Sequence, residues 1–198
     1  MKTSKKILTA LVTPMLLASS LITAQANIFQ YNVTLNGLNE SPANASPGSG
    51  LATIFLDTTL NTLSLNMSFS GLTGPTSAAH IHGATAVAGT GTAGVATTVP
   101  TFTGFPLGVT SGTYSTVLDL TQLSSYNPAY VTANGGTALS SEAALIAAIQ
   151  AGKTYLNIHT STFGGGEIRG FLTPVPEPTT LALLGVGSLL LARAARRR

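Results

Sequence analysis

The sequence predicts an all-β protein, an antiparallel β-sandwich or barrel with one short helix, and three observations support this. Several runs alternate between apolar and polar residues with a period of two, which is typical of strands with one buried face. Glycine-rich breaks separate these runs. Only one segment is composed of good helix formers. The chain has 198 residues, enough for one ordinary domain with a segment attached at each end.

The predicted strands follow one another along the middle of the chain. The alternation is clearest over residues 63–69, where every second residue is apolar, and residues 57–61 form a turn to the preceding strand. Residues 83–112, rich in Gly and Thr, are predicted to be a long irregular excursion with a weak strand at 92–103. The predicted strands are residues 29–35, 50–56, 63–69, 79–82, 113–120, 155–159 and 167–172.

Residues 141–150 form the one predicted helix, because good helix formers occupy nearly every position. Ser140 is expected to cap its start, and Gly152 to end it in a left-handed conformation. Leu145 and Ile149 are one turn apart, so both are predicted to face the core.

The first 26 residues are typical of a secretory signal peptide. Three lysines precede an apolar stretch over residues 7–22, and Ala24 and Ala26 supply the small side chains of a cleavage site. The mature chain is expected to begin at Asn27. The alternative is a buried N-terminal helix, which the lysines and the small residues disfavour.

Residues 175–198 form a second predicted targeting segment, at the C-terminal end of the chain. Pro176, Glu177 and Pro178 precede an apolar run over residues 181–192 and a cluster of arginines. Twelve residues of helix span about 18 Å, short of the roughly 30 Å hydrocarbon core. This order resembles the PEP-CTERM sorting signal, which implies recognition by an exosortase and cleavage near Pro176. A plain C-terminal membrane anchor is the alternative, and both place the domain outside the cytoplasm.

Composition excludes several functions for the middle domain. The net charge of +3 comes from the two ends of the chain, and residues 27–175 contain only Lys153 and Arg169 as cations, against five carboxylates. No basic patch for nucleic acid is therefore expected. The absence of cysteine excludes disulfides, thiolate zinc sites and a cysteine nucleophile. With no hydrolase or phosphate-binding motif either, we expect no enzymatic activity.

The three histidines are the candidate functional residues. His80 and His82 flank Ile81 on a predicted strand, so their side chains share one face, roughly 6.5–7 Å apart, while Ile81 points to the core. His159 lies on another predicted strand, also opposite the apolar positions. If the two strands are neighbours, three imidazoles converge, a ligand set that suits copper or zinc. In the alternative interpretation, hydrogen bonds within the hydroxyl-rich sheet satisfy the imidazoles.

Glu167 and Arg169 are the next candidates, on the strand that follows His159. Glu167 is predicted to be a fourth metal ligand, a group that orients a ligand, or the ion-pair partner of Arg169. A redox centre like that of a dismutase also needs a fourth ligand and an open coordination position, and the sequence identifies neither.

The histidine motifs resemble a known family. A-H-I-H-G at residues 79–83, followed by Y-L-N-I-H-T and G-G-E-I-R-G up to residue 170, is similar to the CHRD domain of chordin and of many exported microbial proteins. The resemblance covers about residues 28–173 and implies an immunoglobulin-like or superoxide-dismutase-like β domain with no established enzymatic activity.

Taken together, these features predict an exported cell-surface or extracellular-matrix protein with three parts, namely residues 1–26, 27–174 and 175–198. The middle part is expected to be a binding or structural module. Its expected partners are an exosortase-type processing enzyme, the membrane before cleavage, and exopolysaccharide or surface proteins. Copper or zinc is the expected cofactor if the histidines bind a metal.

Overall fold

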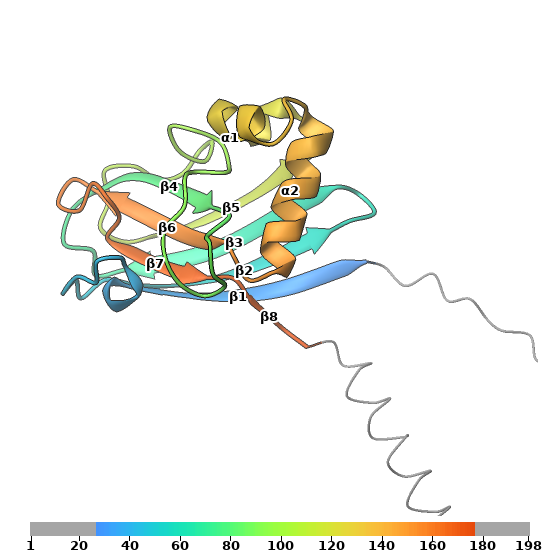
Figure 1. Cartoon of the computed structure of the whole chain (residues 1–198). Coiled ribbons are helices and arrows are strands. Elements are labelled where there is room, and N and C mark those ends of the chain that lie inside the picture. Colours follow the sequence, from blue (N-terminus) through green and yellow to red (C-terminus); the bar gives the residue numbers. More distant parts are fainter. Residues whose placement is uncertain (1–26, 177–198) are drawn as a thin grey trace, which may run out of the picture.

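A computed structural model describes residues 27–176, which form one curled antiparallel sheet flanked by two helices (Figure 1). The predicted signal peptide, including Ala24 and Ala26, and residues 177–198, including Glu177 and Pro178, lie outside the described residues. The strands are β1 (Ile28–Asn36), β2 (Ser49–Asp57), β3 (Thr62–Ser70), β4 (Thr76–His82), β5 (Gly112–Asp119), β6 (Tyr155–Thr160), β7 (Ile168–Phe171) and β8 (Thr173–Pro174). The α-helices are α1 (Pro128–Ala133) and α2 (Ala138–Gln150), and the short 3-10 helices are η1 (Gly37–Asn39) and η2 (Leu123–Ser125).

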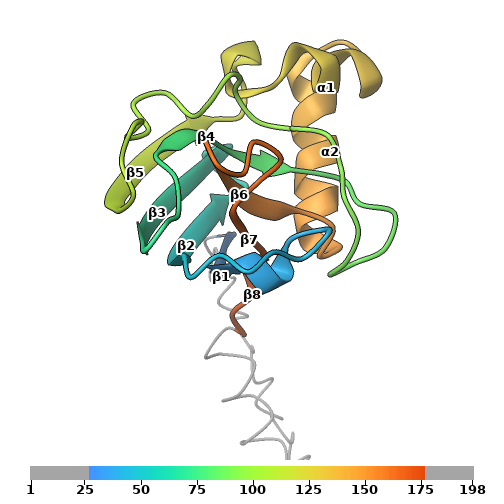
Figure 2. The same cartoon turned by 90° about the vertical axis from the view of Figure 1, so that its left-hand side faces the viewer.

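The strands are ordered β4-β6-β7-β1-β2-β3-β5, and β8 pairs with β1. All pairs are antiparallel. The sheet bends into a half-barrel, with the helices at one end (Figure 2). The predicted all-β antiparallel fold is therefore confirmed, and each strongly alternating run is a strand. The predicted turn after β2 is also present.

Alternating burial along the strands produces the core. On β3, Leu63, Leu65, Met67 and Phe69 are buried, whereas the intervening serines and Asn66 lie toward solvent. Fully burying one such side chain contributes roughly 1.5–3 kcal/mol. The core is lined by matching residues on the other strands and by α2, where Leu145 and Ile149 are buried as predicted.

Helix α2 begins three residues before the predicted start, because Thr137 rather than Ser140 is its N-cap. The Thr137 hydroxyl accepts a hydrogen bond from the Ser140 amide at 3.1 Å, and the Ser140 hydroxyl accepts one from the Thr137 amide at 3.3 Å. This reciprocal pair is a capping box. Gly152 follows the helix with φ +66°, the predicted left-handed conformation. Helix α1, which was not predicted, is too short to show a helical period.

The predicted excursion between β4 and β5 is present, but residues 92–103 contain no strand. They form only isolated bridges, such as the one between Val95 and His82. Their hydroxyls bond to β4 one at a time: the Ile81 amide donates to Thr97 Oγ1 and the Ala79 amide to Thr101 Oγ1, each at 2.9 Å. These contacts cover the edge of β4, which would otherwise expose unpaired backbone groups.

Candidate metal centre

Strands β4 and β6 are hydrogen-bonded neighbours, and this brings the three histidines onto one face of the sheet. In the strand register, Ala78 lies opposite His159 and His80 opposite Asn157. His159 is therefore diagonal to His80, and His82 follows two residues along β4. The three ring centroids lie 5.3–5.7 Å apart. On the other face of these strands, the apolar side chains are fully buried in the core, as the alternation predicts.

Each imidazole is oriented by a backbone carbonyl. Because a carbonyl oxygen only accepts hydrogen bonds, the ring nitrogen beside it carries the proton and the other nitrogen keeps its lone pair. The protonated nitrogens and their acceptors are His80 Nε2 with Pro100 (2.6 Å), His82 Nδ1 with Ala93 (3.0 Å) and His159 Nδ1 with Gly164 (3.0 Å). Metal-bound histidines commonly make the same contact.

The lone-pair nitrogens, His80 Nδ1, His82 Nε2 and His159 Nε2, are buried and have no hydrogen-bond partner. One ring nitrogen of each histidine lies within 4.8 Å of one ring nitrogen of each of the others. Metal–nitrogen bonds measure about 2.0–2.1 Å, so closing around one ion requires each ring to move by at most about 1 Å. The set is therefore close to the spacing of a three-histidine ligand group.

Burial keeps the three imidazoles neutral. The excursion covers His80 and His82, which are only 6% and 7% exposed, whereas His159 is half-buried. This burial lowers the pKa of His80 and of His159, and lowers the pKa of His82 to about 4, although the carbonyl contacts oppose the shift. At neutral pH all three side chains are therefore in the form that binds metal.

The His82 side chain is expected to remain neutral well below the ordinary pKa of histidine. Followed by the NMR shifts of its ring in metal-free protein, it should titrate near pH 4. Because its pKa is lower in the folded than in the unfolded chain, His82 destabilises the fold as the pH falls from about 6.5 to 4. A midpoint near 6.5 in the folded protein would contradict the buried arrangement.

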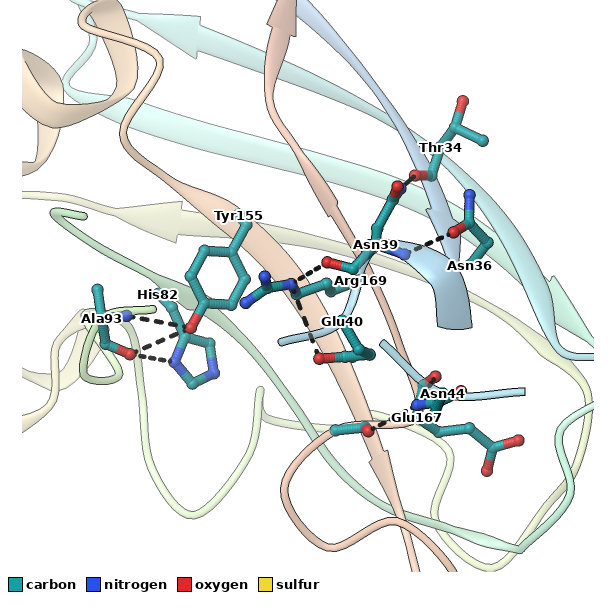
Figure 3. Close-up of polar contacts among 11 residues, drawn as sticks. Thr34, Asn36, Asn39, Glu40, Asn44, His82, Ala93, Tyr155, Glu167 and Arg169 are labelled. Atoms are coloured by element: carbon teal, nitrogen blue, oxygen red, sulfur yellow. Dashed lines mark hydrogen bonds and ion pairs between the residues drawn. The ribbon is translucent and has the colours of Figure 1, made fainter. Parts of the chain in front are cut away.

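Tyr155 supports His82 from the neighbouring strand (Figure 3). The two rings stack with centroids 4.8 Å apart. The Tyr155 hydroxyl donates to the Ala93 carbonyl at 3.2 Å, the same oxygen that accepts the His82 Nδ1 proton. Tyr155 thus holds both the ring and the carbonyl that orients it.

The ion pair of Arg169 is with Glu40, not with Glu167. Arg169 Nε lies 3.7 Å from Glu40 Oε2 and also donates to the Asn39 carbonyl (Figure 3). Glu40 belongs to the loop after η1, which lies 129 positions before Arg169 in the chain. The short distance in sequence suggested Glu167 as the partner of Arg169. This was wrong, because β7 pairs with β1 and brings the loop of Glu40 against Arg169.

Burial raises the pKa of Glu40 to about 7, although the charge of Arg169 opposes this.

Glu167 holds the loops before β2 and β4 against the end of β6. Its carboxylate accepts hydrogen bonds from the hydroxyls of Ser46 and Thr160, each at 2.6 Å, and from the amides of Thr73 and Gly74. Burial raises the pKa of Glu167, but these four bonds outweigh it and lower the pKa below its ordinary value. The interpretation of Glu167 as a fourth ligand is therefore not supported, because its oxygens are committed to other groups.

Unpartnered buried polar atoms concentrate on the histidine face. Five of the six such atoms in residues 27–176 belong to Glu40, His80, His82, Asn157 and His159. Asn157 lies opposite His80 in the register. A Cβ built on Gly166 would come within 2.5–2.8 Å of the Asn157 amide and Glu40 Oε1, so both groups border the same space. Native proteins contain few such atoms, and a cluster of them indicates a missing ligand or water.

The sequence places Tyr155 and Asn157 on the same face as His159, because the three alternate along the strand that became β6, and the structure confirms this. What the sequence did not identify is the contact that each makes in this region, or the presence of Glu40. No comparable signal exists for Glu40, because only the fold brings its loop to Arg169.

The fold and the site together define an all-β domain with a histidine cluster on one face of its sheet. The CHRD domain family matches residues 31–172, and the PEP-CTERM protein-sorting motif matches residues 174–198. The chain belongs to the CHRD domain family. No curated protein matches the chain, and no solved structure matches it.

These matches settle where the protein acts. The sorting motif directs an exported protein through an exosortase-type processing enzyme, with transient membrane anchoring before cleavage and a cell-surface or extracellular location. No helix within residues 27–176 is long and apolar enough to cross a membrane. Pro176, the first residue of the motif's Pro-Glu-Pro, follows β8 at the end of the described part of the chain.

Proposed function

We propose that this CHRD domain is a displayed binding module that binds a copper or zinc ion through His80, His82 and His159. One observation carries the proposal: the three histidines come together with one ring nitrogen of each within 4.8 Å of the others, and each ring has one nitrogen bonded to a carbonyl and one that is buried without a partner. Both ions accept neutral imidazole ligands, whereas calcium and magnesium prefer oxygen.

Three histidines leave one position of a four-coordinate ion for another group. Asn157 Oδ1 is buried and unpartnered beside His80, and a water molecule is the other choice. When bound, such an ion supplies Lewis acidity at that position. The chain's own contribution is to keep the imidazoles neutral, oriented and covered. We make no proposal of catalysis by this centre.

Titration of the metal-free protein with copper or zinc in a calorimeter tests the proposal. We expect tight binding of one ion per chain in the wild type and no specific binding in a variant with all three histidines changed to Ala. The chain contains no other histidine and no cysteine, so the variant retains no imidazole or thiolate. Equal binding by a folded triple variant would contradict the proposal.

Contact with exopolysaccharide or with surface proteins is the second part of the proposal. The outward positions of β1, β2, β3 and β5 support it, because most carry uncharged Ser, Thr, Asn or Gln side chains, and Leu51 and Val117 are exposed among them. Such a face suits a neutral, hydroxylated surface. The proposed metal site lies on another part of the sheet, on β4 and β6.

A further inference from the structure

A second polar space lies on the outer side of β1 and β7, beside the loop over residues 89–91. This cavity of about 710 Å³ is bordered by main-chain and side-chain groups of η1 and its following loop. Glu40 and Arg169 are the only ionisable side chains in its lining. Most of the remaining lining is polar and uncharged, and includes Asn32, Thr34, Thr90 and Thr173.

Arg169 has an unusual set of contacts for a buried cation. Its side chain is 4% exposed, and its guanidinium carbon lies 4.6 Å from the ring centroid of Tyr155 and 5.9 Å from that of Phe171. Nε donates to the Asn39 carbonyl and faces Glu40. Nη1 and Nη2 donate to no residue between 27 and 176. The aromatic rings fix the plane of the guanidinium, and within this described part of the chain the terminal donors have no acceptor.

We propose that this cavity binds a hydroxylated monocarboxylate, the chemical class of a uronic acid, with its carboxylate on the terminal nitrogens of Arg169. A planar guanidinium matches the two oxygens of a carboxylate. The threonine and asparagine side chains around it provide partners for sugar hydroxyls. Glu40 lies beside the guanidinium, so a doubly charged phosphate is disfavoured there relative to a single carboxylate.

This site uses none of the three histidines, so it stands apart from the proposed metal centre. Tyr155 contacts both, because it stacks on His82 and lies under the guanidinium of Arg169. Asn157 also lies between the two, opposite His80 on one side and Arg169 on the other. The test is therefore made on metal-free protein in the presence of a chelator, where the outcome at the histidines has no influence.

Titration of the purified protein with sodium glucuronate, followed by NMR or calorimetry, tests the proposal. We expect saturable binding of one glucuronate per chain and at least tenfold weaker binding of glucose, which lacks the carboxylate. Arg169→Gln should reduce the affinity for glucuronate at least tenfold. Lys153→Gln is the matched control, because Lys153 is the only other cation in residues 27–175 and does not line the cavity. It should bind as the wild type does.

Glu40→Gln keeps the test decisive if Arg169→Gln fails to fold. Removing the neighbouring carboxylate while keeping its shape should strengthen glucuronate binding several-fold. The proposal is overturned if the wild type does not bind glucuronate, if glucose binds equally well, or if Glu40→Gln leaves the affinity unchanged or weaker.

Discussion

Replacing Gly170 with alanine is expected to destabilise the protein by about 3 kcal/mol, a large share of the stability of a typical domain. A Cβ at this position would overlap the backbone oxygen of Thr34 on β1. Because that neighbour is backbone rather than a flexible side chain, the two strands must separate. The only β1–β7 pair in the register is Asn36 with Arg169, next to this contact. The added methyl group therefore pushes apart the two halves of the sheet at their junction.

Chemical denaturation of the two proteins measures this effect as a shift in the midpoint. Gly165→Ala is the matched control, because a Cβ there meets no atom within 4 Å and no positive φ is required. It should change the stability by less than about 0.5 kcal/mol. If Gly170→Ala and Gly165→Ala unfold at the same denaturant concentration, the close approach of β7 to β1 is wrong.

Copper or zinc at about 1,000 times its dissociation constant is expected to stabilise the protein by about 4 kcal/mol. For a domain of this size, that corresponds to a rise of roughly 10 °C in Tm. The physical reason is that the folded chain holds the three lone pairs together, whereas the unfolded chain does not. Metal binding free energy is thereby added to folding free energy.

Thermal unfolding with and without metal, followed by circular dichroism, measures the shift. Addition of a chelator should return Tm to the metal-free value. The triple His→Ala variant should show no metal-dependent shift, even if its own Tm differs from that of the wild type. An equal rise of Tm in that variant would assign the stabilisation to binding elsewhere.

The strands could be predicted because the alternation of apolar and polar residues within each strand shows which of its faces is buried. Along β3 every second residue is apolar, and the same residues are buried in the structure. Where a segment is not paired to a neighbour in a regular register, this signal fails. Residues 92–103 contain alternating residues, but they meet β4 through scattered hydroxyl and backbone hydrogen bonds rather than a regular ladder, and they form no strand. The predicted start of α2 was wrong because both Thr137 and Ser140 are residue types that cap helices. Only the backbone geometry shows that Thr137 is the N-cap.

The histidines of the candidate site were predictable, but their surroundings were not. His80 and His82 share a face because of strand geometry alone, and His159 could be placed opposite the apolar residues of its own strand. The carbonyls of Pro100, Ala93 and Gly164 come from loops that carry no such pattern. These contacts decide which nitrogen of each ring keeps its lone pair.

By itself, the sequence determined the all-β class, the C-terminal sorting segment, the family and the positions of the three histidines, because each of these depends on residue type at short spacing. Only the tertiary structure decided that β4 and β6 are neighbours, that the excursion covers His80 and His82, and that Arg169 pairs with Glu40 rather than Glu167. These features join residues far apart in the chain. They follow from the order in which strands pair and from how a loop packs over them, which local periodicity does not encode.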